Sequence, residues 1–501
     1  MPGEPSEFHW GAPGPPPPDP PGHRRARART RRRSRVVVVG LVCAVAVVLG
    51  AVALLRQGGD AGGARAEGRV AAAGQERGVA LRPSSARGHE LFRREVPAGT
   101  PVGASFRTVR VWATSEVLVR TTKYAVEGLD PVTGTRRWTV PLSGRVCGAS
   151  ETMTSGGKVA VVFEPAKLEI THAPCSELAV IDISAGRKLW QKTIDGMDSS
   201  GDGHLVVAVT EEAVAVDWYR EGWAPGARTY SLDGRRKLWA ARPAGENRCS
   251  ERLVRGGEGL YTLERCWSET LEYSYTVRLR DPVTGRTEWS FRSPRRDYWT
   301  FRLVSVNPTV LAITERADLA DGVDESATRL MTVGEDGKLR AEIRLPTPAR
   351  GCGGLQGTCG TVVAAGGKVY VKTGALAAGE LTAYDFRTGK VAWRAEAAGG
   401  RRPLWPLRMD DSGEGLIAYE PASDSGSGTG GRVVRLDAED GSREEWLRLP
   451  DASAEEQSQA DGVVRGAPPL FAYGRLYFQL QATLGTADPP PALLAFGAEQ
   501  G

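Results

Sequence analysis

Short runs of alternating apolar and polar residues fill most of the chain beyond residue 88. Two of them are "LAVID" at residues 178–182 and "TVRLR" at residues 276–280. Alternation with a period of two predicts strands that bury one face. Asp and Gly often separate one run from the next, which is typical of a tight hairpin turn whose Gly takes a positive φ. No sustained 3.6-residue period occurs between these runs, so the pattern predicts an all-β structure.

The hairpin belongs to a repeat. "DPVTGTRRW" ends at Trp138, "DPVTGRTEW" ends at Trp289, and further copies also end in Trp. The tryptophans of six copies, separated by 52, 49, 50, 104 and 53 residues, are Trp138, Trp190, Trp239, Trp289, Trp393 and Trp446. The double step contains a degenerate copy without Trp, "GEDGKLRAEI" at residues 334–343. A large aromatic at one position of nearly every unit predicts that these rings dock against the neighbouring unit.

Each repeat of about 50 residues contains four strand-like runs, which is the size and content of a propeller blade. The two ends of the repeat region complete one another. "GHELFRREVP" at residues 88–97 has the pattern of a last strand, and "PALLAFG" at residues 491–497 has the pattern of a third strand that lacks its fourth. Joining them adds an eighth blade to seven repeats and removes an open sheet edge. We therefore predict an eight-bladed β-propeller of four-stranded blades over residues 88–501.

The best-kept copy, "AYDFRTGKVAW" from Ala383, resembles the repeats of the pyrroloquinoline-quinone (PQQ)-like propellers. That family includes quinoprotein alcohol and glucose dehydrogenases and the non-enzymatic scaffold of the outer-membrane assembly machinery. The resemblance covers about four-fifths of the chain. It implies the propeller fold and leaves activity open, because function depends on sites grafted onto a fold.

A quinoprotein activity, as the resemblance implies it, needs a vicinal Cys–Cys disulfide, Glu and Asn ligands for calcium, and an Asp base. The sequence has no adjacent cysteines and only two Asn, Asn247 and Asn307. His89, His172 and His204 fall in three different repeat segments, and no G-x-S-x-G elbow is present. We expect no catalytic, cofactor-binding or metal-binding residues and no enzymatic activity. The alternative is a quinoprotein-type or other enzyme that uses the central funnel of the propeller.

The amino-terminal part predicts a membrane anchor. Residues 1–35 are rich in Pro and hold eight Arg against three acidic residues, and they predict a disordered cytoplasmic tail. "VVVVGLVCAVAVVLGAVALL" from Val36 to Leu55 has twenty uncharged residues, enough to span about 30 Å as a helix. Arg on its amino side predicts that this end is cytoplasmic and the propeller extracytoplasmic. A cleaved signal peptide is the alternative. Residues 56–87 predict a flexible linker.

Charge excludes one class of partner. The net charge of +5 is accounted for by residues 1–35, since eight Arg against three acids give +5. The remaining 57 basic and 57 acidic residues sum to zero. A neutral propeller has no electrostatic footprint for nucleic acid, so we expect no nucleic-acid partner.

Six of the seven cysteines follow the predicted span, as expected of an oxidising compartment. Six cysteines allow fifteen pairings, and the repeat map narrows them because two cysteines fall in each of three alternate units. We predict three local disulfides, Cys147 with Cys175, Cys249 with Cys266, and Cys352 with Cys359. A zinc site is disfavoured because no Cys-x-x-Cys or nearby His completes a ligand set.

Two segments depart from the repeat through their aromatic content. They are "DWYREGW" at residues 217–223 and "RDYWTF" at residues 296–301, and they mix Trp, Tyr and Arg, the types enriched at binding hot spots. The candidate partner-binding residues are Trp218, Tyr219, Trp223, Tyr298 and Trp299. The alternative is that they belong to the blade cores. We expect a membrane-anchored binding or scaffold propeller for a protein or cell-envelope partner.

Overall fold

The computed structural model divides the chain into two compact units, Met1–Ala64 and Arg65–Gly501. The described residues all belong to the second unit. They are 79–95, 109–166, 174–197, 204–219, 226–240, 249–270, 272–296, 298–315, 326–349, 352, 359–373, 380–397, 404–422, 429–454, 457, 469–479 and 491–498.

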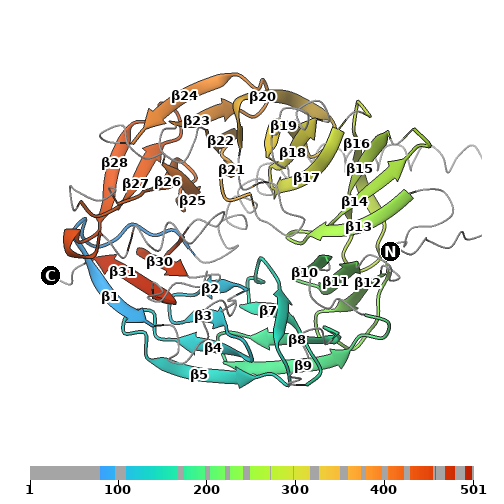
Figure 1. Cartoon of the computed structure of the whole chain (residues 1–501), viewed down its shortest axis with the longest axis horizontal. Coiled ribbons are helices and arrows are strands. Elements are labelled where there is room, and N and C mark those ends of the chain that lie inside the picture. The colour runs from blue at the N-terminus through green and yellow to red at the C-terminus, as the bar shows by residue number, and fades with distance from the viewer. Residues whose placement is uncertain are drawn as a thin grey trace, which may run out of the picture. The chain divides into compact units, whose positions relative to one another are not determined.

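Within these residues the second unit folds into eight antiparallel sheets, which follow one another around a ring as the blades of a propeller (Figure 1). The first four blades, each given from the inner to the outer strand, are β2 (Val111–Ala113), β3 (Leu118–Thr121), β4 (Ala125–Leu129) and β5 (Arg136–Pro141); β6 (Val146–Ala149), β7 (Lys158–Phe163), β8 (Glu177–Asp182) and β9 (Arg187–Thr193); β10 (His204–Val209), β11 (Ala213–Tyr219) and β12 (Gly226–Ser231); and β13 (Cys249–Arg255), β14 (Leu260–Trp267), β15 (Tyr273–Arg280) and β16 (Thr287–Arg292).

The other four blades, in the same order, are β17 (Tyr298–Val306), β18 (Thr309–Glu315), β19 (Ala327–Val333) and β20 (Leu339–Ala349); β21 (Val362–Ala365), β22 (Lys368–Lys372), β23 (Glu380–Asp385) and β24 (Val391–Glu396); β25 (Trp405–Met409), β26 (Gly415–Glu420), β27 (Arg432–Asp437) and β28 (Arg443–Arg448); and β29 (Leu470–Ala472), β30 (Arg475–Gln479), β31 (Leu493–Ala498) and β1 (Gly88–Arg94). A short 3₁₀ helix, η1 (Asp451–Ser453), follows β28. The eight-bladed all-β propeller predicted from the repeat is confirmed.

The last blade is built from both ends of the propeller, as predicted. Strand β1 pairs antiparallel with β31, with Gly88 opposite Ala498 and Arg94 opposite Leu493. Figure 1 shows the two strands side by side, β1 in blue and β31 in red. Because β31 also pairs with β30, it has a hydrogen-bonded neighbour on each side and the ring has no open edge at this point.

One blade departs from the predicted four strands. Among the described residues the β10–β12 blade has three, and its outer position is held by a bridge between Tyr230 and Lys237 and by backbone hydrogen bonds that join Thr229 to Leu238 and Trp239. The outgoing segment therefore still lies beside β12, although its described part is too short to form a strand.

The repeated tryptophans pack between blades. Trp138 and Trp190 lie against the turn glycines of the next blades, Gly186 and Gly234, so that a methyl group added at either glycine would overlap the indole. Both glycines have φ above +60°, which an L side chain rarely adopts. Trp190 also donates from Nε1 to the carbonyl of Leu232 at 2.8 Å. The repeat therefore keeps a Trp and a Gly for one contact, made across the blade boundary.

Other blade boundaries use the same contact or a substitute. Trp239 and Trp393 lie against Gly285 and Gly441 of the next blades. In the degenerate copy, Ala341 takes the place of Trp and contacts the next turn glycine together with Ile343. Three further indoles or rings complete the series: Trp289 lies beside Gly337, Phe92 beside Gly134, and Trp446 beside Phe471.

The turn aspartates predict how the fold responds to acid. The Oδ1 atom of Asp130 accepts from the backbone N–H of Val132 and Thr133 at 2.9 and 2.8 Å, and Asp385 makes the equivalent pair of bonds in its own turn. The backbone hydrogen bond from Thr133 lowers the pKa of Asp130, and the hydroxyl of Thr388 together with its backbone N–H lowers the pKa of Asp385. A carboxyl whose folded pKa is depressed stabilises the fold above its unfolded pKa, and this stabilisation is lost as pH falls through the folded pKa.

We therefore expect the melting temperature to fall progressively below about pH 4, the ordinary range of Asp. Differential scanning calorimetry over an acid series measures this. Asp385→Asn keeps the acceptor oxygen without the charge, and its melting temperature should change less with acid than that of the unaltered protein. An equal slope in both would show that these turns do not carry the acid response.

The chain enters the propeller before the predicted start of the domain. The backbone N–H of Tyr473 donates to the carbonyl of Val79 at 2.6 Å, and that of Ala80 donates to Asp411 Oδ1 at 3.1 Å. Ala80 is buried in the apolar cluster between the last two blades. Residues 79–87 of the predicted linker are therefore fixed on the propeller, because an apolar side chain among them is part of its core.

Among the described residues, no helix is long and apolar enough to cross a membrane. The predicted span Val36–Leu55, the predicted tail 1–35 and linker residues 56–78 lie outside the described residues.

Candidate functional site

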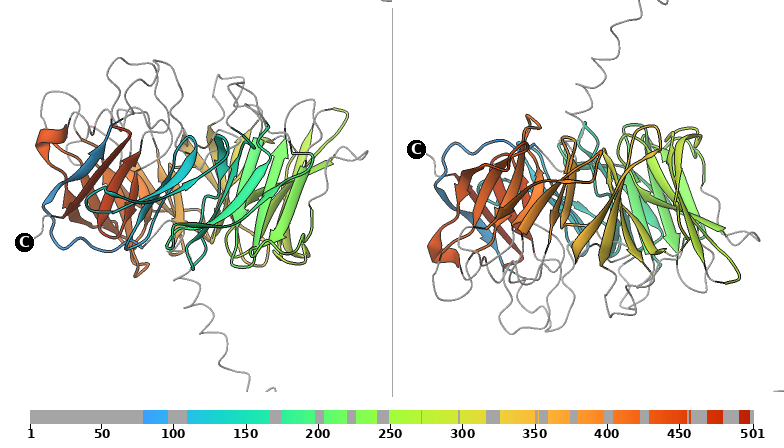
Figure 2. Two further views of the ribbon diagram at one scale, coloured as in Figure 1. Left: turned by 90° about the horizontal axis from the view of Figure 1, so that it is seen from below. Right: turned by 90° about the horizontal axis from the view of Figure 1, so that it is seen from above.

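The two faces of the ring differ in their connections. In an antiparallel blade the first and second strands, and the third and fourth, are joined at one face, and all other connections leave from the opposite face. We call these the turn face and the loop face. On the turn face the joins are short: residues 307–308 link β17 to β18, and residues 210–212 link β10 to β11. The loop face carries longer joins, such as residues 449–469 between β28 and β29 and residues 480–492 between β30 and β31. Figure 2 shows the strands running between the two faces.

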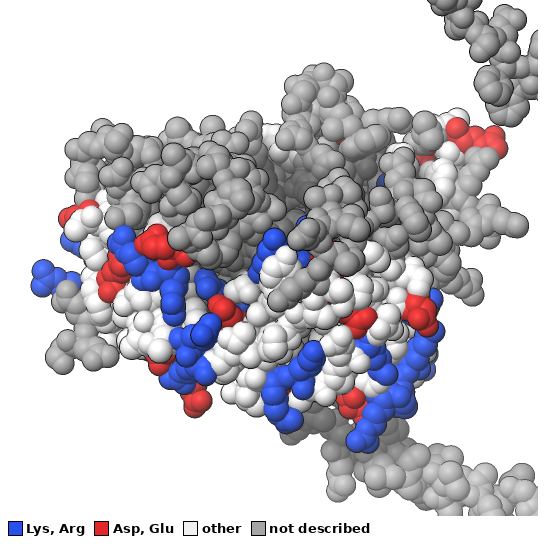
Figure 3. Space-filling model, turned by 60° about the horizontal axis from the view of Figure 1, so that its bottom comes forward, with Lys and Arg blue, Asp and Glu red and all other residues white. Residues whose placement is uncertain are grey.

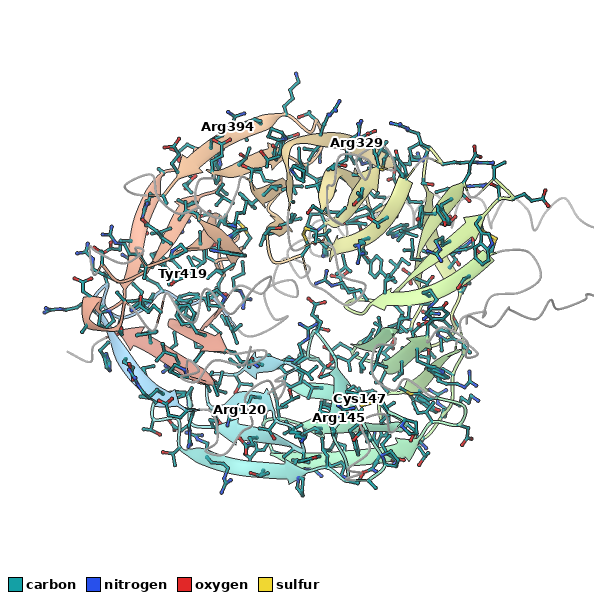
Figure 4. All side chains as sticks on the ribbon, in the orientation of Figure 1. Arg120, Arg145, Cys147, Arg329, Arg394 and Tyr419 are labelled. Atoms are coloured by element: carbon teal, nitrogen blue, oxygen red, sulfur yellow. A yellow bond between two sulfur atoms is a disulfide. The ribbon has the colours of Figure 1, made fainter. Side chains whose placement is uncertain are left out.

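All three disulfides lie at the loop-face ends of strands. The structure joins Cys147 to Cys175, Cys249 to Cys266, and Cys352 to Cys359, the pairs expected from the repeat map. Cys249 and Cys266 lie directly opposite one another at the ends of β13 and β14. Figure 4 shows Cys147 near the start of β6 beside Arg145. The disulfides therefore restrain the face that carries the long connections.

The candidate partner-binding residues differ in their exposure. Trp218 and Tyr298 are 3% and 1% exposed and belong to apolar clusters. Both side chains therefore lie where the alternative of blade core expects them. Tyr219, one residue beyond Trp218, points the other way and is 42% exposed at the loop-face end of β11. Trp223 and the side chain of Trp299 lie outside the described part of the structure.

A buried ion pair lies next to Tyr219. Asp217 is 1% exposed, and its carboxylate accepts from the backbone N–H of Leu253 at 3.0 Å. The guanidinium of Arg252 is 2.9 Å from the same carboxylate, with its carbon 4.9 Å from the ring centre of Tyr219. Burial raises the pKa of Asp217 to about 7, against the opposite effect of Arg252. The pair links the β10–β12 blade to the β13–β16 blade next to the exposed Tyr219.

This contact could not be predicted directly, since Asp217 and Arg252 are 35 positions apart and belong to different repeats. A polar residue within an otherwise apolar strand, "AVAVDWY", is the one clue.

The residues do not fit a quinoprotein centre. Within the part of the chain that the structure describes, no group of three His, Cys, Asp or Glu side chains is arranged to hold a metal ion. The disulfides join cysteines at least seven positions apart, so none is vicinal. His89 lies on the outer strand β1 and His204 on the inner strand β10 of a distant blade, while His172 is outside the described residues.

The described surface shows no concentration of one charge on the side drawn in Figure 3, where cationic and anionic side chains are interspersed with uncharged ones. Several basic residues of the described part form ion pairs, such as Arg93 with Glu90 at 2.7 Å and Arg137 with Asp130 at 2.6 Å. This mixed distribution agrees with the zero net charge beyond residue 35.

Comparison with protein families matches residues 48–221 and 274–478 to the family described as outer membrane protein assembly factor BamB. Among solved structures, BamB from Moraxella catarrhalis is 12% identical, with 79% of this chain and 97% of that chain covered and a TM-score of 0.41. Quinohemoprotein alcohol dehydrogenase from Comamonas testosteroni is 13% identical, with 86% and 78% covered and a TM-score of 0.47. A europium-containing methanol dehydrogenase is 12% identical, with 79% and 93% covered and a TM-score of 0.44. A search of curated proteins finds no match.

Proposed function

Because this chain belongs to the PQQ-like β-propeller family described as outer membrane protein assembly factor BamB, we propose that it is a non-catalytic binding or scaffold protein of the cell envelope. Val36–Leu55 anchor it in the cell membrane, with the tail inside and the propeller outside. Its partner is a protein or another envelope component, which binds at the loop face.

The observation that carries this proposal is the asymmetry between the two faces. The repeated Asp, Gly and Trp residues serve the turns and the blade boundaries, which every blade must keep. The departures from the repeat, in connection length and in aromatic content, collect at the loop face. Variable connections on a rigid scaffold are where binding residues are usually found.

The first described residues lie on the turn face. Val79 and Ala80 bond to Tyr473 and Asp411, which lie in turns of the turn face. The described chain therefore enters the propeller on the face opposite to the one proposed for the partner.

The exposed tyrosine gives the test. Tyr219 lies at the loop face, whereas Leu339, of similar exposure at 39%, lies at the turn-face end of β20. We expect Tyr219→Ala to weaken partner capture by about tenfold or more, as the loss of an aromatic interface anchor typically does, with an unchanged melting temperature. Leu339→Ala should leave capture unchanged. Replacing Trp223 by Ala should act like Tyr219→Ala.

Proximity labelling makes the measurement in the native cell. The full-length protein carries a labelling enzyme after Gly501, and labelled proteins are identified with and without each replacement. Labelling confined to envelope and exported proteins, and reduced by Tyr219→Ala and by the Trp223 replacement but not by Leu339→Ala, supports the proposal. Labelling of cytoplasmic proteins would show that the orientation is wrong. Stoichiometric binding of quinone with calcium by the purified protein would instead favour the enzyme alternative.

A further inference from the structure

Lys372, the last residue of β22, is a buried cation at the loop face. It is 7% exposed, and its Nζ is 4.0 Å from the ring centre of Trp405, the first residue of β25 in the next blade. No Asp or Glu among the described residues forms an ion pair with it. A buried ammonium without a counter-ion is costly, and contact with an indole face offsets only part of that cost.

The same backbone position in other blades is occupied differently. The backbone N–H of Lys372 donates to the carbonyl of Thr361 at 2.8 Å, and the equivalent bonds join Thr121 to Arg110 and Glu164 to Arg145. The hydroxyl of Thr121 accepts from the backbone N–H of Val109. The carboxylate of Glu164 lies 2.9 Å from the guanidinium of Arg145. The polar side chains of Thr121 and Glu164 thus have a partner within their own blade. No such partner within its blade is found for the ammonium of Lys372 among the described residues.

The surroundings of Lys372 keep this cation in place. Thr361, which receives the backbone bond from Lys372, has its hydroxyl 3.4 Å from Cys352 Sγ and 3.6 Å from Cys359 Sγ. The disulfide between these cysteines therefore restrains the inner strand beside the lysine. Trp405 is held by the neighbouring blade, in ladder contact with Tyr419. The ammonium and the indole are thus fixed from two separate blades.

Burial lowers the pKa of Lys372 from 10.5 to about 8, so the side chain is still mainly protonated at neutral pH. The folded protein binds this proton less tightly than the unfolded chain. The fold therefore carries a penalty at pH values below 8, which disappears as pH rises from 8 to 10.5. An uncharged side chain of similar length would avoid the penalty. Residues kept at a cost in stability are commonly functional.

We propose that Lys372 and Trp405 form a binding site for an anionic oxygen group, a carboxylate or a phosphate, that a ligand presents at the loop face between the β21–β24 and β25–β28 blades. This inference rests on the proposed binding function and specifies the kind of chemical group that the loop face binds. The ligand's anion supplies the counter-ion that the described residues do not, and a charge-assisted hydrogen bond to a buried ammonium is among the stronger polar contacts. The indole then packs against the adjoining part of the ligand.

The site is tested by following the lysine itself. The full-length protein in detergent is reductively ¹³C-methylated, and the pKa of each dimethyl-lysine is measured by NMR with acetate, inorganic phosphate or sodium chloride at equal ionic strength. Loss of one signal in Lys372→Met assigns it. We expect acetate or phosphate to raise the pKa of Lys372 by about one unit or more, as an adjacent opposite charge does. Lys368, at the turn-face end of the same strand, should not respond.

The three anions distinguish the possible ligands. A response to acetate alone assigns a carboxylate, and a response to phosphate alone assigns a phosphate. A response to neither, or an equal response to chloride, overturns the site, while capture dependent on Tyr219 would still support the loop face as the binding surface. Lys372→Met should raise the melting temperature at pH 7, by an amount that vanishes toward pH 10.5. A lower melting temperature at pH 7 would show that Lys372 is a structural residue and would also overturn the proposal.

Discussion

Deletion of residues 491–501 will prevent the propeller from folding into a cooperative unit. The deletion removes β31, in which Leu493, Leu494, Ala495 and Phe496 are completely buried. Strand β1 then loses the strand it pairs with, and β30 becomes an open edge. Each large side chain lost from a core costs about 2–5 kcal/mol, so three of them approach or exceed the total stability of about 5–15 kcal/mol that is usual for a domain.

The experiment compares two truncations of the full chain. Circular dichroism and calorimetry follow the melting of a protein that lacks residues 491–501 and of one that lacks only residues 499–501, which follow β31. We expect a cooperative transition in the second and none in the first. Phe496→Ala gives a graded version, with an expected loss of about 3–5 kcal/mol. A cooperative transition with an unchanged midpoint in the longer truncation would contradict closure through β1 and β31.

The blade plan was predictable from sequence because it depends on a local pattern that recurs. The Asp and Gly of each turn set a tight hairpin, and the Trp that follows docks on the turn glycine of the next blade, as Trp190 does on Gly234. Both partners of this contact recur in most repeats, so their spacing reveals the number of blades. The closing blade was predictable for the same reason, since each terminus carries a fragment of the pattern.

The candidate site was less predictable because its contacts join unrelated positions. Trp218 and Tyr219 are adjacent in a segment rich in aromatic and charged residues, and composition does not show which of them is buried. The period of two shows that they face opposite ways, but not which face meets the next blade. Lys372 becomes notable only when its backbone bond to Thr361 aligns it with Glu164, because the repeats differ in length ahead of this position.

Replacing Arg252 by Met will destabilise the boundary between the β10–β12 and β13–β16 blades by about 3–5 kcal/mol, the usual cost of leaving one member of a buried ion pair alone. The carboxylate of Asp217 would lose the guanidinium and keep the hydrogen bond from the backbone N–H of Leu253. Met fills much of the space of the Arg stem, so the loss reports charge more than volume. Chemical denaturation monitored by circular dichroism measures the difference in unfolding free energy.

The double variant Asp217→Asn, Arg252→Met is the matched control. The Asn oxygen can still accept from Leu253, and neither position of the pair carries a charge, so most of the lost stability should return. Arg93→Met breaks an ion pair at the outer strand β1, where the Arg side chain is 40% exposed, and should cost less than about 1 kcal/mol.

The pH dependence of Arg252→Met has a definite sign. Burial already raises the pKa of Asp217 from 3.8 to about 7, so the stability linked to this carboxyl is fully present below pH 3.8 and is lost as pH rises through 7. Without the guanidinium the pKa rises further, and the deficit of the single variant relative to the unaltered protein should grow between about pH 5 and pH 8. The double variant has no carboxyl at this position, and its difference from the unaltered protein should shrink over the same interval. A deficit in Arg252→Met that is constant with pH would mean that Arg252 stabilises the boundary through its packing against Tyr219, and that its charge contributes little.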